Sequence, residues 1–214
     1  EEKTETVTSE ARSRRKFAVA QSIEPCAGTA GALRFRGPML QRLALLVLLL
    51  SGLAGCATAP PSGWQQGGAP LVVPRARWVN GDVLVDVDTD GVVTLGGKHL
   101  LTVDRAGRVY DLENEPIALL DAKGYVHGPD DKPMGWVGAG EAVLPGGEGS
   151  WLMMDATGLV VRRSGDGDRP FGQWLGCGYA QTVQTCMLIS HIVGAQIVEA
   201  QRSRPRVGVG IGIG

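Results

Sequence analysis

The sequence has few aromatic residues and few histidines, and this limits the chemistry it can support. Of 214 residues only 5% are aromatic, and histidine occurs three times. The chain has no Gly-x-Ser-x-Gly segment, which is the elbow that exposes a nucleophilic serine in one large hydrolase class. His191 follows Cys186 by five residues, which does not make them neighbours on a helix. We therefore expect neither catalytic activity nor a cofactor.

The chain also lacks an excess of positive charge. It carries 21 Lys and Arg against 22 Asp and Glu, a net charge of −1. From Cys56 onward the counts are 13 and 17, a net charge of −4. Proteins that bind nucleic acid neutralise phosphates with a basic surface. The group Arg202, Arg204 and Arg206 is local and is interpreted as a solvated linker. Nucleic acid is excluded as a partner.

The apolar run over residues 43–50 is too short to span a bilayer, which needs about 20 helical residues. Arg42 precedes it, and small residues follow over 51–55. A basic start, an apolar middle and a small-residue end are the parts of an export signal. The sequence thus predicts a signal peptide over 39–55. Residues 1–38 precede the first methionine and are interpreted as an upstream, non-native extension.

The signal ends in Leu53-Ala54-Gly55-Cys56, which resembles the lipobox of bacterial lipoproteins. The resemblance implies a diacylglyceryl group on the Cys56 thiol, cleavage just before Cys56, and acylation of the new amine by a fatty acid such as palmitate. Three chains exceed what stable anchoring in a bilayer needs. Ala57, where an Asp would favour retention in the inner membrane, implies the outer membrane, facing the periplasm. An ordinary signal peptide with a chance cysteine is the alternative.

The mature chain is expected to begin with a tether and to contain one disulfide. Residues 56–74 are rich in Pro, Gly and Gln, a composition that favours a flexible coil reaching about 25 Å. Cys177 and Cys186 lie nine residues apart and are exported to a compartment that permits disulfides. We expect them to be bridged, with free buried thiols as the alternative.

An internal repeat of about 17 residues occupies residues 75–178. Each copy has an apolar residue followed by Asp-x-x-Gly, as in Val103-Asp104-Arg105-Ala106-Gly107. A valine follows each Asp position by five residues, and an apolar residue stands three positions before each apolar-Asp pair. The copies begin with Val87, Val103, Leu120, Val137 and Met154, the one at Val137 lacks the Asp, and Pro170 opens a partial sixth copy.

The spacing predicts a β-hairpin in each copy, because Asp and Gly stabilise a tight turn between two apolar segments. We therefore expect a mainly β protein of five to six hairpins, closed as a meander barrel or folded as a sandwich. A β-solenoid is the alternative. Residues 179–203 lack proline and predict one helix. The Gly-rich residues 204–214 alternate like an edge strand or form a poorly ordered tail.

Two weak ligand sites are visible in the sequence. Asp86, Asp88 and Asp90 match the first half of a calcium-binding loop, but Gly97 stands where the final Glu is needed. Trp174 is the tryptophan least constrained by the repeat and is a candidate for stacking on a sugar, whereas Trp136 and Trp151 fall within the repeat and are expected to pack in the core.

These features together favour an envelope lipoprotein with a structural or protein-interaction role, anchored in the bilayer through Cys56 and bound to an unidentified envelope protein or glycan. A glycan-binding lipoprotein is the main alternative, and an envelope hydrolase is a lesser one. Exposure of the tryptophans separates the first two: buried rings favour an interaction protein, and an exposed coplanar pair favours glycan binding.

Overall fold

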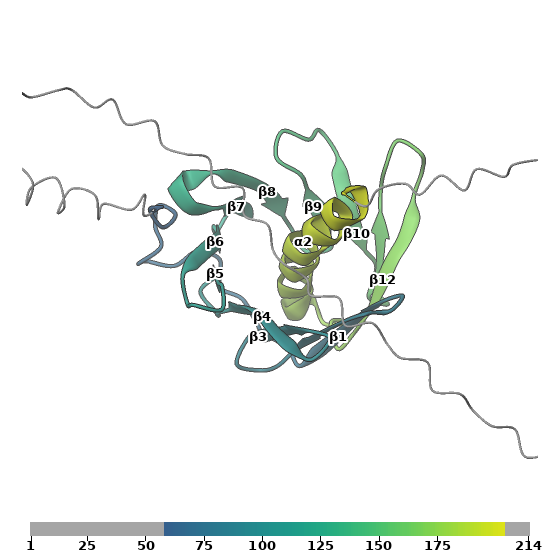
Figure 1. Ribbon diagram of the computed structural model, residues 1–214, viewed down its shortest axis with the longest axis horizontal. Coiled ribbons are helices and arrows are strands. Elements are labelled where there is room, and N and C mark those ends of the chain that lie inside the picture. Colours follow the sequence, from purple (N-terminus) through teal and green to yellow (C-terminus); the bar gives the residue numbers. More distant parts are fainter. Residues whose placement is uncertain (1–57, 204–214) are drawn as a thin grey trace, which may run out of the picture. The chain divides into compact units, whose positions relative to one another are not determined.

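Twelve antiparallel strands form a closed barrel, followed by one helix (Figure 1). The computed structural model describes residues 58–203. The strands are β1 (Ala76–Asn80), β2 (Val83–Val87), β3 (Val92–Leu95), β4 (Lys98–Val103), β5 (Arg108–Tyr110), β6 (Pro116–Leu120), β7 (Tyr125–His127), β8 (Pro133–Val137), β9 (Glu141–Val143), β10 (Ser150–Met154), β11 (Leu159–Arg162) and β12 (Arg169–Leu175). A 3-10 turn, η1 (Pro129–Asp131), precedes β8, and the helix is α2 (Ala180–Arg202).

Each repeat copy is a hairpin, as the spacing predicts. The hairpins are β2–β3, β4–β5, β6–β7, β8–β9 and β10–β11, and neighbouring hairpins pair around the barrel. The partial sixth copy is β12, which pairs with β1 from the other end of the chain and closes the ring. The prediction of a mainly β fold with a C-terminal helix is confirmed. Of the three architectures left open, the closed barrel is the one that forms.

The Asp of each repeat fixes its turn. The Asp104 carboxylate accepts the backbone N–H of Ala106 at 2.8 Å and of Arg108 at 3.0 Å. Asp88, Asp121 and Asp155 accept the equivalent two N–H groups. This arrangement places one oxygen opposite the donors of both the turn and the next strand. The carboxylates thus serve the fold in four of the five hairpins, and only the β8–β9 hairpin lacks one.

The glycine of each turn also joins one hairpin to the next. The carbonyl oxygen of Gly91 accepts the N–H of Val103 at 2.9 Å, and that of Gly107 accepts the N–H of Leu120 at 2.9 Å. The same bond recurs from Gly124, Gly140 and Gly158, and each of these five glycines has a positive φ. The turns are therefore joined in series by hydrogen bonds at one end of the barrel, which we call the turn end. The connections between hairpins lie at the opposite, loop end.

Alternate strand residues face the interior. The buried residues match the valine column expected from the sequence except in one copy. Val93, Val109, Val126 and Val160 are buried, but in the copy without Asp the turn is one residue shorter and Ala142 takes the place of Val143. In the column that begins with Leu84, Leu84 itself is 40% exposed while the following Val85 is buried, and Leu100, Ile117 and Met134 are partly buried against the core. A bulge between Ser150 and Leu152 turns Trp151 of that column inward.

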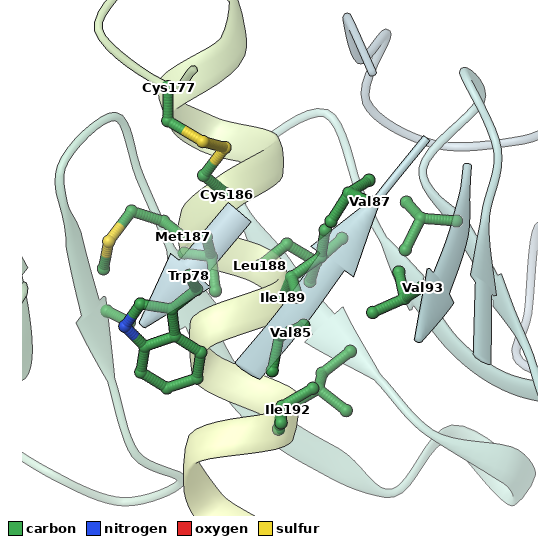
Figure 2. Packing of buried hydrophobic residues seen from close by; sticks show 14 of the residues in the cluster. Trp78, Val85, Val87, Val93, Cys177, Cys186, Met187, Leu188, Ile189 and Ile192 are labelled. Atoms are coloured by element: carbon green, nitrogen blue, oxygen red, sulfur yellow. A yellow bond between two sulfur atoms is a disulfide. The ribbon is translucent and has the colours of Figure 1, made fainter. Parts of the chain in front are cut away.

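Helix α2 fills the barrel. Its residues 185–194 are all buried, which happens when every face of a helix is covered. Figure 1 shows α2 surrounded by strands, and Figure 2 shows Ile189 and Ile192 against Val85, Val93 and their neighbours. Length and composition alone would also suit a membrane-spanning helix. Here its apolar character is explained by the barrel interior, which twelve strands make wider than side chains alone can fill.

The segment 58–74, expected to be part of a flexible tether, is instead packed on the barrel. Ala69, Leu71 and Val73 are buried. Their backbone is paired as well: Ala69 donates to the carbonyl oxygen of Leu120 at 2.8 Å, and Leu71 donates to that of Arg105 at 2.9 Å. The Gly- and Pro-rich composition is compatible with an extended strap because Ala69, Leu71 and Val73 find buried positions, while Val72 between them stays exposed. We call residues 58–74 the strap.

Candidate interaction surface

Some of the expected features lie outside the described residues. These are the lipidation site Cys56, the signal peptide over 39–55, the extension over 1–38 and the tail over 204–214. They stay predictions. The remaining candidates, which are Cys177, Cys186, the three aspartates of the calcium motif and Trp174, all have defined positions.

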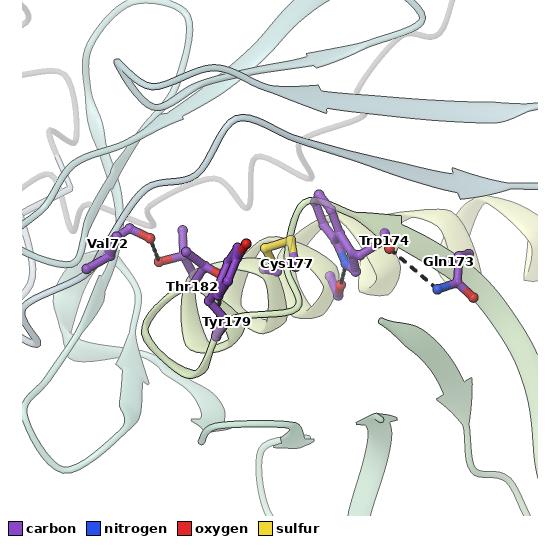
Figure 3. Close-up of a disulfide and its surroundings, with 9 residues drawn as sticks. Val72, Gln173, Trp174, Cys177, Tyr179 and Thr182 are labelled. Atoms are coloured by element: carbon purple, nitrogen blue, oxygen red, sulfur yellow. Dashed lines mark hydrogen bonds between the residues drawn. A yellow bond between two sulfur atoms is a disulfide. The ribbon is translucent and has the colours of Figure 1, made fainter. Parts of the chain in front are cut away.

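The two cysteines are brought together as a disulfide at the turn end. Cys177 follows β12, and Cys186 lies in the second turn of α2, with 6.3 Å between their Cα atoms. Figure 3 shows the bridge beside the first turn of the helix. Both residues are buried. The bridge therefore fixes the point at which the chain leaves the barrel wall and enters its interior.

The glycan-binding candidate Trp174 is wrong, because the structure buries it. Trp174 is 2% exposed, its ring stacks on Trp78 at 5.9 Å between centroids, and its indole N–H donates to the Ser190 hydroxyl at 2.8 Å (Figure 3). Trp151 is buried too. Trp136 is half-buried, with its indole N–H bound to the carbonyl oxygen of Lys123 at 2.9 Å. The tryptophans serve packing and turns.

The three aspartates of the calcium motif do not converge on one point. Asp86 pairs with the guanidinium of Arg77 at 2.5 Å, and Asp88 accepts the two N–H groups of its own turn. No group of His, Cys, Asp or Glu within residues 58–203 is arranged to hold a metal ion. Asp86 lies in β2 and Asp88 lies in the turn after it, so the two carboxylates have different partners.

One polar network inside the barrel is invisible in the sequence. His191 of α2 donates from Nε2 to the carbonyl oxygen of Met134 at 2.7 Å and accepts the indole N–H of Trp151 at Nδ1 at 2.8 Å. Burial lowers the pKa of His191, opposed by the bond to Met134. In the neutral form of the ring both nitrogens have a hydrogen-bond partner, so His191 connects α2 to β8 and β10. The sequence separations of 57 and 40 residues hide these contacts from pattern analysis.

A cleft of about 650 Å³ lies at the turn end of β1, β2, β3 and β12. Its walls include Arg75, Arg77, Asp86, Asp88 and Leu175. Arg77 is held by Asp86, whose hydrogen bond raises the pKa of the guanidinium. Among the described residues, Arg75 has no ion-pair partner. The cleft thus offers one neutralised charge pair and one further cation.

Exposed apolar side chains lie at the same end. Leu175 is 58% exposed in the cleft wall. Tyr179, at 74%, caps the start of α2, and Val72, at 49%, accepts the Thr185 hydroxyl at its carbonyl oxygen (Figure 3). Large apolar side chains left exposed beside a charged cleft are typical of a surface that binds another molecule. The signal was missed because these residues come from two distant parts of the sequence.

No protein-family model matches the chain, and neither the curated proteins nor the solved structures include one that is significantly similar to it. The candidate surface thus has to be interpreted from its own geometry.

Proposed function

We propose that this protein is a bacterial envelope lipoprotein, anchored in the outer membrane through Cys56 and facing the periplasm, with a structural or protein-interaction role. The anchor is supported by the lipobox sequence. The interaction role is supported mainly by the filled interior: α2 occupies the barrel with all faces of residues 185–194 buried. The barrel therefore has no internal chamber for a substrate, and any partner has to bind at the surface.

The turn end is the surface that suits a partner best. It combines the cation of Arg75 with the exposed apolar side chains of Leu175, Tyr179 and Val72. An aromatic or aliphatic anchor beside an arginine is the usual composition of an interface centre. A protein segment carrying a carboxylate next to an apolar side chain would satisfy both. The disulfide and the series of turn hydrogen bonds hold this end in place, so little conformational entropy is lost on binding.

Site-specific photo-crosslinking tests this role. A photoreactive phenylalanine replaces Leu175, and in a matched control it replaces Leu112, which is 53% exposed in the β5–β6 connection at the other end. In intact envelopes, the Leu175 position should give a discrete protein adduct that the Leu112 position does not give. Equal adducts at both positions, or none at either, would contradict the proposal. An adduct that carries sugar and resists protease would favour the glycan-binding alternative.

A further inference from the structure

The first residues of the strap are held by the β7–β8 connection. Ala59 donates its N–H to the Asp130 carboxylate at 2.9 Å, and Asp130 returns its own N–H to the carbonyl oxygen of Ala59 at 2.9 Å. Ser62 donates its N–H and its hydroxyl to Asp131, at 2.7 and 2.5 Å. These bonds lower the pKa of Asp131, so the carboxylate keeps its charge. The four residues 59–62 are fixed at this point.

The holding residues adopt an uncommon backbone conformation. Asp130 and Asp131 each have φ of 56°, in the left-handed region. Two successive residues other than glycine in this region are costly, and such conformations persist where the surrounding contacts require them. Here the contacts are those with the strap. The connection is therefore built to hold residues 59–62 and is more than a link between two strands.

Further contacts hold the strap along the barrel. The Arg108 guanidinium donates to the carbonyl oxygens of Trp64 at 2.7 Å and Gln65 at 2.9 Å. The Trp64 ring packs edge-on against Tyr110, with 5.0 Å between centroids. Gly68 then donates to the carbonyl oxygen of Ala106 at the turn end. The strap thus starts at the loop end and reaches the turn end before β1.

Both ends of the described chain lie at the loop end. Gln184 of α2 bonds to the carbonyl oxygen of Val137, and His191 bonds to that of Met134. The helix therefore runs antiparallel to β8, toward the loop end, and its last residues extend beyond His191 by about 16 Å at 1.5 Å per residue. Arg202 ends α2, and Lys132 lies in the connection that holds the strap. Arg204 and Arg206 follow in the sequence.

The length of chain between the lipid and the held strap is very short. Only Cys56 and Ala57 precede Thr58, and consecutive Cα atoms lie about 3.8 Å apart. The Cα atom of Cys56 can thus lie no more than about 8 Å from that of Thr58. A free coil over residues 56–74 would instead allow about 25 Å. Because the strap is held on the barrel, little of the free chain length expected from the composition remains between Cys56 and the barrel.

We propose that the loop end of the barrel lies directly against the lipid headgroups, in one fixed orientation, because the strap holds the chain next to the lipid-carrying Cys56. The inference rests on the proposed function, since it requires the lipid on Cys56. The turn end, with its cleft, then faces away from the membrane.

Quenching by labelled lipids measures this orientation. The full mature lipoprotein is placed in vesicles of phosphatidylethanolamine and phosphatidylglycerol that include lipids with a nitroxide on the headgroup. A fluorophore is attached at Lys132→Cys, at the loop end, or at Asp90→Cys, in a turn at the other end; both native residues are exposed. The Lys132 position should be quenched several-fold more strongly than the Asp90 position, because five-residue strands separate the two ends by about 17 Å.

Two variants test the role of the strap. Insertion of about ten Gly and Ser residues between Ala57 and Thr58 restores slack of about 17 Å without changing the barrel. Asp130→Ala combined with Asp131→Ala releases the strap itself. In each, the two fluorophore positions should approach equal quenching, while flotation of the vesicles still carries the protein.

The outcomes separate the inference from the proposed function. If the wild-type protein floats with the vesicles but both positions are quenched equally, the fixed orientation is wrong and the lipid anchor stands. If quenching at Lys132 remains strong after the linker insertion, the strap does not determine the orientation, and the inference is overturned. If the protein purified from membranes does not float at all, the lipid anchor itself fails and the inference fails with it.

Discussion

At the scale of single residues, the turn glycines carry two demands at once. Each needs a positive φ, and each lies where the next hairpin approaches its Cα. A Cβ placed on Gly91 would lie 1.9 Å from the carbonyl oxygen of Val103, and one on Gly158 would lie 2.6 Å from that of Trp174. Backbone cannot move aside as a flexible side chain can. Glycine is therefore required by the join between hairpins as well as by the turn.

A comparison of Gly91→Ala with Gly96→Ala separates the need for a positive φ from the need for space beside the next hairpin. Gly96 also has a positive φ, but a Cβ there would meet no atom within 4 Å, so Gly96→Ala reports the backbone strain alone, about 1 kcal/mol. Gly91→Ala should lower the free energy of unfolding by at least about 1 kcal/mol more, since the Val103 contact must break as well. Denaturant melts of both variants make the comparison. Equal losses would show that the join between hairpins contributes nothing.

At the scale of elements, much of the barrel is predictable and the strap and interior are not. The turn in each hairpin follows from Asp and Gly a fixed distance apart, so it depends on neighbours in the sequence. The copy that contains Gly138-Ala139-Gly140 shows the limit of this prediction. Its position in the repeat is predictable, but its shortened turn is not. The strap is held by residues about 70 positions away, such as Asp130 and Asp131. Composition records no such contact.

The same limit applies to the candidate sites. The disulfide between Cys177 and Cys186 is predictable because few cysteines remain in the mature chain and the loop between them is short. The burial of Trp174 is not, since it depends on α2 entering the barrel and placing Ser190 beside the indole. The cleft at the turn end combines residues of β1, β2, β3 and β12, and closure of the ring is what brings them together.

Helix α2 makes the barrel sensitive to acid through His191. Burial lowers the pKa of His191 in the folded protein below its ordinary value of 6.5. As the pH falls, His191 in the unfolded chain therefore binds a proton before His191 in the folded protein does. The contribution of the neutral His191 to the free energy of unfolding is complete above about pH 6.5 and is lost as the pH falls through the folded pKa. Protonation would also remove the Nδ1 acceptor of Trp151.

Unfolding measured in denaturant at a series of pH values checks this expectation. The free energy of unfolding should decrease between neutral and mildly acidic pH, and His191→Gln should flatten the decrease while lowering stability at neutral pH. The variant His99→Gln makes the same substitution at an exposed position and is measured for comparison. A slope that persists in His191→Gln would assign the acid sensitivity to another group.

At the scale of the whole molecule, the barrel is a rigid body with two different ends. The loop end carries the start of the strap and the end of α2, and the turn end carries the disulfide, the cleft and the exposed Leu175 and Tyr179. The ring of strands has no free edge, so a partner cannot bind by adding a strand. Attachment at the loop end and recognition at the turn end is the division of roles that we propose.

The account depends most directly on the lipid at Cys56, and the mass of the N-terminal peptide tests it. The protein is purified from bacterial membranes beside a Cys56→Ser variant. We predict that the wild-type peptide begins at residue 56 and carries a diacylglyceryl group and an amide-linked acyl chain, while the variant stays unprocessed and unlipidated. An unmodified wild-type peptide, or a variant that is cleaved and retained in the membrane as the wild type is, would contradict the account.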